Sequence, residues 1–294
     1  MKIRQIAKIK AGQDGAIYDN YLFRFDTRGN CCVYDVSSFA ANGDEVIDLA
    51  PISEFSLDRV DEIMPHSNSV CFGSDYYEEG DEFPLLYTNV YNTYAKCAEF
   101  ENTNNRRCGE CCVYRIKREG EAFSSELVGI IAIGFTSDRA LWRSSGDVAD
   151  VRPYGNFVVD TENRKYWAYT MRDGERETRY FRFRLPSLSS GKPDDVLGIP
   201  RVTLTPSDIE EQFDVPYHNY VQGGIFHGGK VYEVEGFGKD VRAAIRVIDT
   251  EKKCEELYFD FYSAGYEVEP EFIDFYNEKC IYIDAHGSVF YLEF

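Results

Sequence analysis

Histidine, methionine and tryptophan are scarce in this sequence: its 294 residues include four, three and two of them, respectively. Positive charge is also in short supply, because 32 Lys and Arg residues stand against 51 Asp and Glu residues and leave a formal net charge of −19. Such a surplus repels phosphate backbones and anionic lipid surfaces within the Debye length. We therefore expect neither nucleic acid nor a membrane as a partner, and the simplest role of the charge is solubility.

Long apolar runs are missing as well. No window approaches the ~20 consecutive apolar residues of a membrane-spanning helix. The N-terminal segment from Met1 to Lys10 alternates basic and apolar residues and lacks the apolar centre of a signal peptide. For an untrimmed chain, these absences predict a cytoplasmic protein.

Several catalytic signatures are absent. The sequence contains no G-x-S-x-G elbow, no phosphate-binding loop and no dinucleotide-binding fingerprint. Gly236 and Gly238 flank Phe237 in a predicted hairpin rather than in front of a helix. The usual classes of nucleotide-dependent enzyme are therefore disfavoured.

Cysteine is present, but its placement argues against disulfides. Nine is an odd number, and the adjacent pairs Cys31–Cys32 and Cys111–Cys112 fall at the starts of predicted strands. Neighbours on a strand point to opposite faces, so neither pair forms a disulfide or shares a metal, and we expect reduced, mostly buried thiols. A weaker alternative is a zinc site formed by Cys97, Cys108, Cys111 and Cys112. It is weaker because the sequence offers neither a histidine partner nor a second C-x-x-C pair.

Aromatic residues are abundant at 15%, with 22 Tyr and 21 Phe. These side chains suit the half-buried face of a pleated sheet, so the composition favours strands over helices. A chain of this length buries roughly 75% of its unfolded surface and needs no metal to hold a core. We expect an all-β protein without a cofactor.

A short motif precedes three predicted strands. Proline fixes φ and favours an extended predecessor, while asparagine bonds to nearby backbone, so the motif suits a chain entering the first strand of a new unit. The copies are Pro65-His66-Ser67-Asn68, Pro153-Tyr154-Gly155-Asn156 and Pro216-Tyr217-His218-Asn219. We interpret them as starts of repeated units.

Taking these motifs as unit starts divides the chain into five units of predicted strands separated by polar turns. The last unit supplies three strands, and the alternating segment 3–9 is free to complete it as an outer strand. Short helical turns are expected at 56–64 and 207–213. The predicted strands are 15–18, 21–26, 31–37 and 45–49; 70–73, 84–91, 112–117 and 127–134; 157–160, 165–171, 178–185 and 201–204; 224–226, 230–235, 244–249 and 256–261; and 272–276, 280–284 and 288–294.

This layout resembles the β-propeller superfamily over the whole chain, with radial four-stranded sheets around a channel. The resemblance implies a single domain: a five-bladed β-propeller of antiparallel sheets, with the N-terminal strand closing the last blade. The blades are expected at approximately 11–55, 66–135, 154–205, 220–262, and 269–294 plus 2–10. A sixth blade is left open, because the units exceed the ~40 to 50 residues of common propeller repeats. No motif names a member family.

Proteins that resemble this layout bind ligands at the channel mouth, among the loops that precede each first strand and those that join second to third strands. Three of the four histidines fall on this expected rim, although polar loops and turn caps alone would also explain them. The candidate ligand-binding residues are Asp14, His66, Asn68, Arg152, Tyr154, Asn156, His218, Gln222, Glu269, Glu271 and His286; Gln13, Asn219, Glu267, Arg172, Asp173, Lys239 and Asp240 share these loops.

Two candidate chemistries follow from these residue types. Glu269 and Glu271 flank Pro270, so both could face the channel and divide acid and base roles, unless they are solvated or paired with Arg152. Imidazole and carboxylate groups also suit zinc, manganese or iron, but no local spacing supports a metal site built from His66, His218, His286 and a glutamate.

The sequence predicts a monomer that binds a small polar ligand, sugar-like or peptide-like, at the channel mouth. The alternative is a hydrolase, lyase or cyclotransferase. Its acid or base would be Glu269 or Glu271, its proton shuttle His66 or His218, and its orienting residue Asn68 or Asn156. Gln222-Gly223-Gly224 resembles a short element of propeller-type glutaminyl cyclotransferases, which is too short to transfer the activity. Protein scaffolding is a third possibility.

Overall fold

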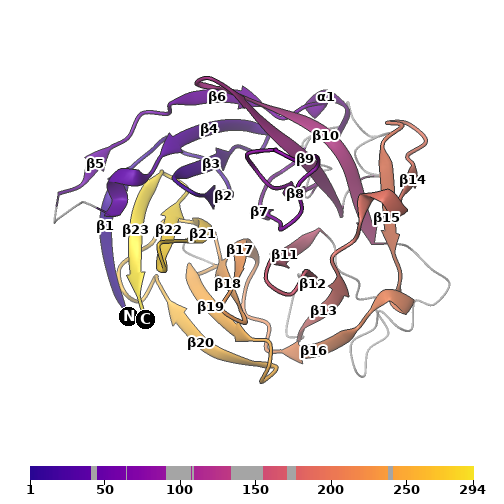
Figure 1. Ribbon diagram of the computed structural model, residues 1–294. Coiled ribbons are helices and arrows are strands. Elements are labelled where there is room, and N and C mark those ends of the chain that lie inside the picture. Colours follow the sequence, from indigo (N-terminus) through magenta and orange to yellow (C-terminus); the bar gives the residue numbers. More distant parts are fainter. Residues whose placement is uncertain are drawn as a thin grey trace.

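The computed structural model describes residues 1–40, 45–63, 65–90, 107, 109–133, 155–170, 177–237 and 241–294. Five sheets stand around a central axis and form a five-bladed β-propeller (Figure 1). The short helical elements include α1 (Val60–Ile63) and the 3-10 turns η1 (Ser37–Ala40), η4 (Leu188–Ser190) and η5 (Pro206–Asp208). No helix of the described chain is long and apolar enough to cross a membrane.

Each blade is a sheet whose strands follow one another outward from the axis. Blade one contains β2 (Gly15–Tyr18), β3 (Tyr21–Phe25), β4 (Asn30–Asp35) and β6 (Ser53–Ser56). Blade two contains β7 (Val70–Phe72), β8 (Leu86–Asn89), β9 (Glu110–Glu119) and β10 (Ala122–Ile133), extended by β15 (Pro200–Leu204) and β14 (Lys192–Pro193). Blade three contains β11 (Asn156–Asp160), β12 (Lys165–Tyr169), β13 (Thr178–Arg184) and β16 (Glu211–Val215).

The last two blades complete the ring. Blade four contains β17 (Val221–His227), β18 (Lys230–Glu235), β19 (Ala244–Asp249) and β20 (Cys254–Asp260). Blade five contains β21 (Pro270–Tyr276), β22 (Lys279–Asp284) and β23 (Ser288–Glu293), followed by β1 (Lys2–Lys8) and β5 (Ile47–Asp48). The predicted closure is confirmed: β1 pairs antiparallel with β23, from Lys2 opposite Glu293 to Lys8 opposite Ser288.

Two predicted fourth strands are wrong. Segment 45–49 contains β5, which pairs in parallel with β1 of blade five, and the fourth strand of blade one is β6. Segment 201–204 lies in β15, which pairs in parallel with β10 of blade two, and the fourth strand of blade three is β16. The expected helical turns shorten accordingly to α1 and η5, because residues 56 and 211–213 belong to strands. Alternation predicts a strand but does not identify its partner.

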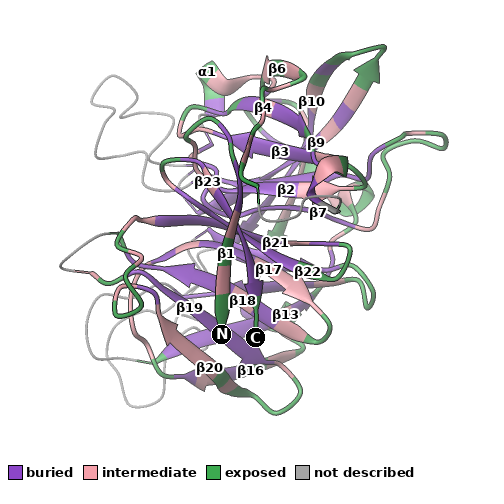
Figure 2. Ribbon diagram, turned by 90° about the vertical axis from the view of Figure 1, so that its left-hand side faces the viewer, coloured by how far each residue is buried: buried purple, intermediate pink, exposed green. Residues whose placement is uncertain are grey.

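Apolar side chains fill the five interfaces between neighbouring blades. Between blades one and two, the rings of Phe23 and Phe72 meet edge to face at 5.3 Å. Cys111 packs toward blade three and Cys112 toward blade one, which confirms that the adjacent pair points to opposite faces. All described cysteines are free thiols; Cys97 and Cys108 lie outside the described residues. Figure 2 shows buried residues along the strands and exposed ones at the turns.

Candidate functional site

Five innermost strands, β2, β7, β11, β17 and β21, line the axis of the ring. We call the end at which they begin the upper mouth and the end at which they finish the lower mouth. Two glycines of β17 leave room for polar side chains at the axis. A Cβ atom on Gly223 would lie 3.1 Å from Asp14 Oδ1, and one on Gly224 would lie 3.1 Å from the Tyr169 hydroxyl. The close approach of the Asp14 and Tyr169 side chains therefore explains the two glycines of the Gln222-Gly223-Gly224 element.

Asp14 is the most deeply buried candidate, with no exposed surface. Its Oδ2 accepts a hydrogen bond from the backbone N–H of Val70 at 2.8 Å, which ties the start of blade one to blade two. Its Oδ1 is buried and has no hydrogen-bond partner within the described chain. Burial raises the pKa of Asp14 well above its ordinary value.

Glu269 and Glu271 flank Pro270, the first residue of β21, at the upper mouth. Gln13 Nε2 donates to Glu271 Oε1 at 2.9 Å, and Gln222 Nε2 donates to Glu269 Oε1 at 2.7 Å. Glu271 is only 2% exposed, and burial together with the charge of Glu269 raises its pKa to about 8. Burial also raises the pKa of Glu269. The alternative of two solvated carboxylates is therefore wrong for Glu271.

Arg24 of β3 is a buried cation near these carboxylates. One of its terminal nitrogens donates to the backbone oxygens of Gly12 at 2.8 Å and Asp284 at 3.3 Å. Burial lowers the pKa of Arg24, while the charges of Glu271 and Asp14 raise it. Sequence reasoning missed this residue, although an arginine inside the apolar run Leu22-Phe23-Arg24-Phe25 is a signal that could have found it.

The two asparagines differ in their surroundings. Asn68 Oδ1 accepts a hydrogen bond from the side chain of Asn89 at 2.5 Å, so Asn68 is held by blade two. Asn156 is 1% exposed, and neither its amide nitrogen nor its side-chain oxygen has a hydrogen-bond partner in the described part of the chain. The side chain of Asn156 can therefore both donate hydrogen bonds to a ligand and accept them from it. Arg152 and Tyr154, like Arg172, Asp173, Lys239 and Asp240, lie outside the described residues.

The three rim histidines do not form a common site. His218 Nε2 lies 2.8 Å from Glu255 Oε2, and its ring contacts Tyr258 with centroids 4.1 Å apart. His66 is half-buried, with its backbone N–H donating to the Asn89 carbonyl, while His286 is exposed at a turn of blade five. The described residues contain no group of three or more His, Cys, Asp and Glu side chains suited to a metal. The geometry of these residues therefore gives the sequence-based metal hypothesis no support.

A buried ion cluster in blade four was also missed. Arg246 has no exposed surface and lies 3.2 Å from Glu235 Oε1 and 3.1 Å from Glu255 Oε2. Glu233 lies 3.9 Å from the same guanidinium and accepts a hydrogen bond of 2.5 Å from the Tyr180 hydroxyl. Burial raises the pKa of Glu235 to about 8. A signal in the sequence could have found this cluster: Glu233 and Glu235 alternate with apolar residues along one strand.

This cluster extends toward the channel. Burial raises the pKa of Tyr169 well above its ordinary value, and the charges of Glu233 and Asp14 raise it further, although its buried hydroxyl makes no hydrogen bond to a described residue. At the other end, Glu255 bonds to half-buried His218. Polar groups therefore continue from the axis through blade four to His218.

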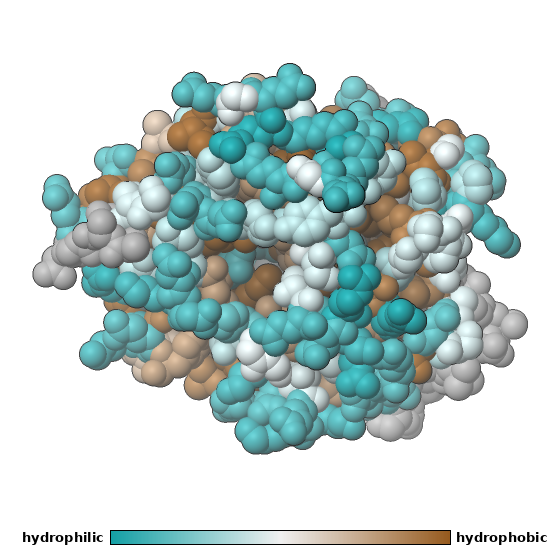
Figure 3. Space-filling view, in the orientation of Figure 1, coloured by the Kyte–Doolittle hydropathy of each residue, from teal (hydrophilic) through white to brown (hydrophobic). Residues whose placement is uncertain are grey.

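The lower mouth holds a separate hollow of about 410 Å³. Figure 3 views the ring from this side and shows the hollow near its centre, with apolar atoms at its floor. Asp274 faces it, but both carboxylate oxygens already accept hydrogen bonds of 2.7 Å from the backbone N–H groups of Ile17 and Phe275. Asp274 therefore serves mainly to join blades one and five.

No protein-family model and no curated protein matches the sequence. Among solved structures, a putative oxidoreductase (glucose dehydrogenase) from a Thermus species is 10% identical, with 99% of both chains covered and a TM-score of 0.45. A luciferin-regenerating enzyme is 10% identical, with 99% of this chain and 94% of that chain covered and a TM-score of 0.46. The chain is a five-bladed β-propeller, and these similarities assign it to no particular member family.

Proposed function

We propose that the upper mouth binds a small polar ligand, sugar-like or peptide-like. The observation that carries this proposal is a set of buried polar atoms around the axis with no hydrogen-bond partner among the residues the structure describes: Asp14 Oδ1, Glu271 Oε2, Asn156 Nδ2 and Oδ1, and Arg24 Nε and Nη1. An unsatisfied buried polar group costs about 1–3 kcal/mol. Such groups normally bind ordered water or a ligand, and here they gather on one channel.

Acceptor oxygens and N–H donors are mixed in this set. Asp14, Glu271 and Asn156 offer oxygens, while Arg24 and the Asn156 amide offer N–H groups. A hydroxyl group both donates and accepts, and a peptide supplies N–H and C=O groups side by side. These two ligand chemistries therefore match the mixed lining, with His66, His218 and His286 at the rim.

The second candidate function is a hydrolase, lyase or cyclotransferase. It is favoured by the proximity of Glu269 and Glu271, whose pKa values are both raised. A carboxyl with a pKa of about 8 carries its proton at neutral pH and can act as a general acid, while its neighbour acts as the base. His218 is hydrogen-bonded to Glu255 of blade four. If His218 acts as the proton shuttle, it would exchange protons with Glu255.

Calorimetry and thermal shift with a panel of monosaccharides, lactones, amino acids and dipeptides test the proposal. We expect one class to bind, and Glu271→Gln to weaken binding about tenfold, since one good hydrogen bond carries about 1.4 kcal/mol in affinity. The matched control is Glu267→Gln, an exposed glutamate of the same segment. Equal affinity in both variants, or no ligand in the panel, would refute the proposal; turnover of the bound compound separates the enzyme from the binder.

We further propose that the protein acts as a monomer in the cytoplasm. The described cysteines form no disulfide, which is typical of proteins in a reducing compartment. Sedimentation analysis at several protein concentrations tests this proposal. A monomer should give a single species whose mass does not change with concentration.

A further inference from the structure

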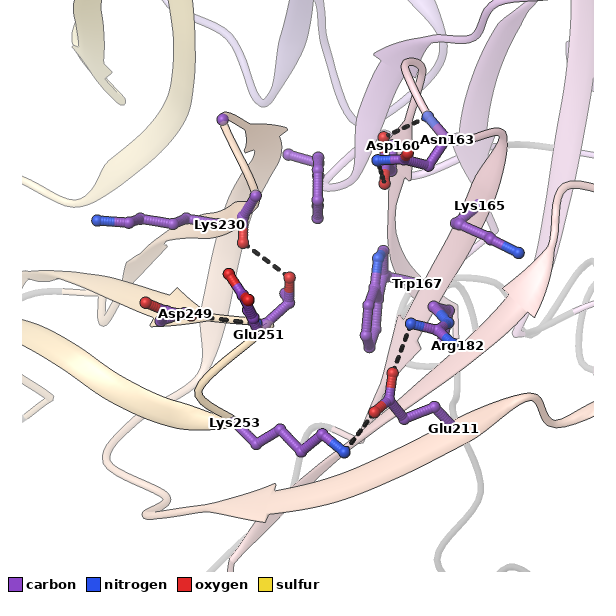
Figure 4. Close-up of a pocket in the computed structure, with 14 residues that line it drawn as sticks. Asp160, Asn163, Lys165, Trp167, Arg182, Glu211, Lys230, Asp249, Glu251 and Lys253 are labelled. Carbon is purple, nitrogen blue, oxygen red and sulfur yellow. Dashed lines mark hydrogen bonds and ion pairs between the residues drawn. The ribbon is translucent and has the colours of Figure 1, made fainter.

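A second groove lies between blades three and four, on the side of the lower mouth (Figure 4). Its walls are the turns that join β11 to β12, β17 to β18 and β19 to β20, and it encloses about 630 Å³. That volume falls within the ~300–1,000 Å³ of sites that hold small molecules. None of the candidate residues of the upper mouth lines this groove.

The floor of the groove is aromatic. Trp167 of β12 lies against blade four, with Phe226 packed beside it. The guanidinium of Arg182 stands 5.7 Å from the indole ring on its outer side. Figure 4 shows the ring of Trp167 between the two walls, with its nitrogen toward the turn that carries Asp160 and Asn163.

The indole N–H of Trp167 has no acceptor among the residues described. The residue is 2% exposed, and its Nε1 atom is buried without a hydrogen-bond partner in those ranges. A buried tryptophan usually donates its N–H, because an unmade bond costs about 1–3 kcal/mol. An acceptor oxygen placed in the groove would satisfy this donor.

Charges around the groove neutralise one another. Four cationic and four acidic residues line it: Lys165, Arg182, Lys230 and Lys253, and Asp160, Glu211, Asp249 and Glu251. Glu211 forms ion pairs with both Arg182 and Lys253, so it bridges the two blades at one end. Lys165 lies 2.7 Å from Glu210, and Lys230 lies 2.5 Å from Glu256. All four cations of the lining are thus paired, so an anionic ligand would have to break an ion pair, whereas a neutral one would not.

The remaining polar groups are small or engaged with the backbone. Asp160 accepts two hydrogen bonds from Asn163, at 2.9 and 3.0 Å. Gly228 and Gly229 form the β17–β18 turn, and a Cβ atom at either position would meet nothing within 4 Å. The wall at this turn is therefore open, and a ligand several rings long can extend past it.

We propose that the groove between blades three and four binds a neutral oligosaccharide. A sugar ring has an apolar C–H face that packs on the half-buried Phe226, and hydroxyl and ring oxygens that accept from the indole N–H of Trp167. Its hydroxyl groups also donate to the carboxylates of the rim without disturbing their ion pairs. The site is independent of the upper mouth.

The fluorescence of Trp167 provides a direct readout. The chain has two tryptophans, so Trp142→Phe leaves Trp167 as the sole one. We expect maltotriose, cellotriose or chitotriose to shift its emission in a saturable manner. No shift with any of the three, or an equal response to a triuronic acid or trilysine, would overturn the proposal.

Calorimetry on Trp167→Phe completes the test, because phenylalanine keeps an aromatic floor and removes the N–H. We expect about tenfold weaker trisaccharide binding in this variant, with thermal unfolding confirming that it is folded. Glu267→Gln, on an exposed residue that does not line the groove, serves as the control and is expected to bind the trisaccharide as the wild type does. Unchanged affinity in Trp167→Phe refutes the site, while loss in Glu271→Gln alone would move the saccharide to the upper mouth.

Discussion

Arg246 determines whether blade four can hold its buried carboxylates. Its guanidinium lies among Glu233, Glu235 and Glu255, two of which have no exposed surface. Water cannot replace the arginine there, so each carboxylate depends on this cation or on taking up a proton. The charge balance of this cluster in blade four therefore depends on one side chain.

Replacing Arg246 with methionine is expected to cost about 3–5 kcal/mol of unfolding free energy, because it leaves buried carboxylates without their counter-ion. Urea denaturation measures the loss. The matched control is Arg242→Met in the same blade, whose side chain is 57% exposed and lies 3.2 Å from Asp260. Exposed pairs contribute at most about 1 kcal/mol. Similar losses in both variants would contradict the assigned role.

Stability is expected to fall as the pH rises through neutrality. Glu235 has a folded-state pKa of about 8, above the ~4.3 of an unfolded glutamate. The folded state therefore holds a proton that the unfolded state has released, and this stabilisation is complete below the unfolded pKa and lost as the pH approaches 8.

Glu235→Gln, which mimics the protonated side chain, tests this dependence. Its stability relative to the wild type should be greater at pH 8 than at pH 5 in urea titrations, and its pH profile should be flatter. Glu267→Gln, on an exposed residue, should keep the wild-type slope. Parallel profiles for all three proteins would show that Glu235 is not the group responsible.

Polar residues of the channel were only partly predictable from the sequence. Asp14, Asn156 and Glu271 were found because they sit where chain segments lead into predicted first strands. Arg24, Glu233 and Arg246 were missed because they lie within strands, where a charged residue is ordinarily assigned to the solvent face. Their burial depends on packing between blades, which a single strand does not encode.

Among the strands, β5 and β15 play equivalent parts. Each follows the third strand of its own blade, crosses to the preceding blade and pairs in parallel with the outermost strand there. Both cover an edge that would otherwise expose unpaired N–H and C=O groups. The sequence predicted these segments as strands of the wrong blade, because alternation and turn spacing report only local conformation.

Strand β1 is the element on which ring closure depends. It buries Ile6 and Ala7 and pairs along its length with β23. Deleting residues 2–8 should lower the melting temperature markedly and expose the edge of β23, which promotes association. Thermal unfolding and size-exclusion chromatography measure both effects.

A synthetic peptide of residues 2–8 added to the truncated protein should restore much of the lost stability, since it can occupy the vacated edge. A peptide of scrambled sequence is the control. A truncated protein that stays monomeric and melts like the full chain would show that β1 is dispensable.

At the scale of the whole molecule, the net charge of −19 opposes compactness. Screening weakens repulsion between separated carboxylates, so moderate salt should stabilise the ring. We expect the melting temperature to rise between about 0.01 and 0.2 M KCl, as differential scanning fluorimetry can measure. A falling melting temperature would mean that surface ion pairs outweigh the general repulsion.

The pairing of Lys2 with Glu293 places both chain ends side by side on neighbouring strands (Figure 1). A short linker could therefore join them, and the β9–β10 turn at Gly120, where a Cβ atom would meet nothing within 4 Å, could supply new termini. In such a circular permutant the last blade would be a continuous polypeptide, and the pairing of β9 with β10, whose connecting turn is cut, would hold the ring closed in blade two.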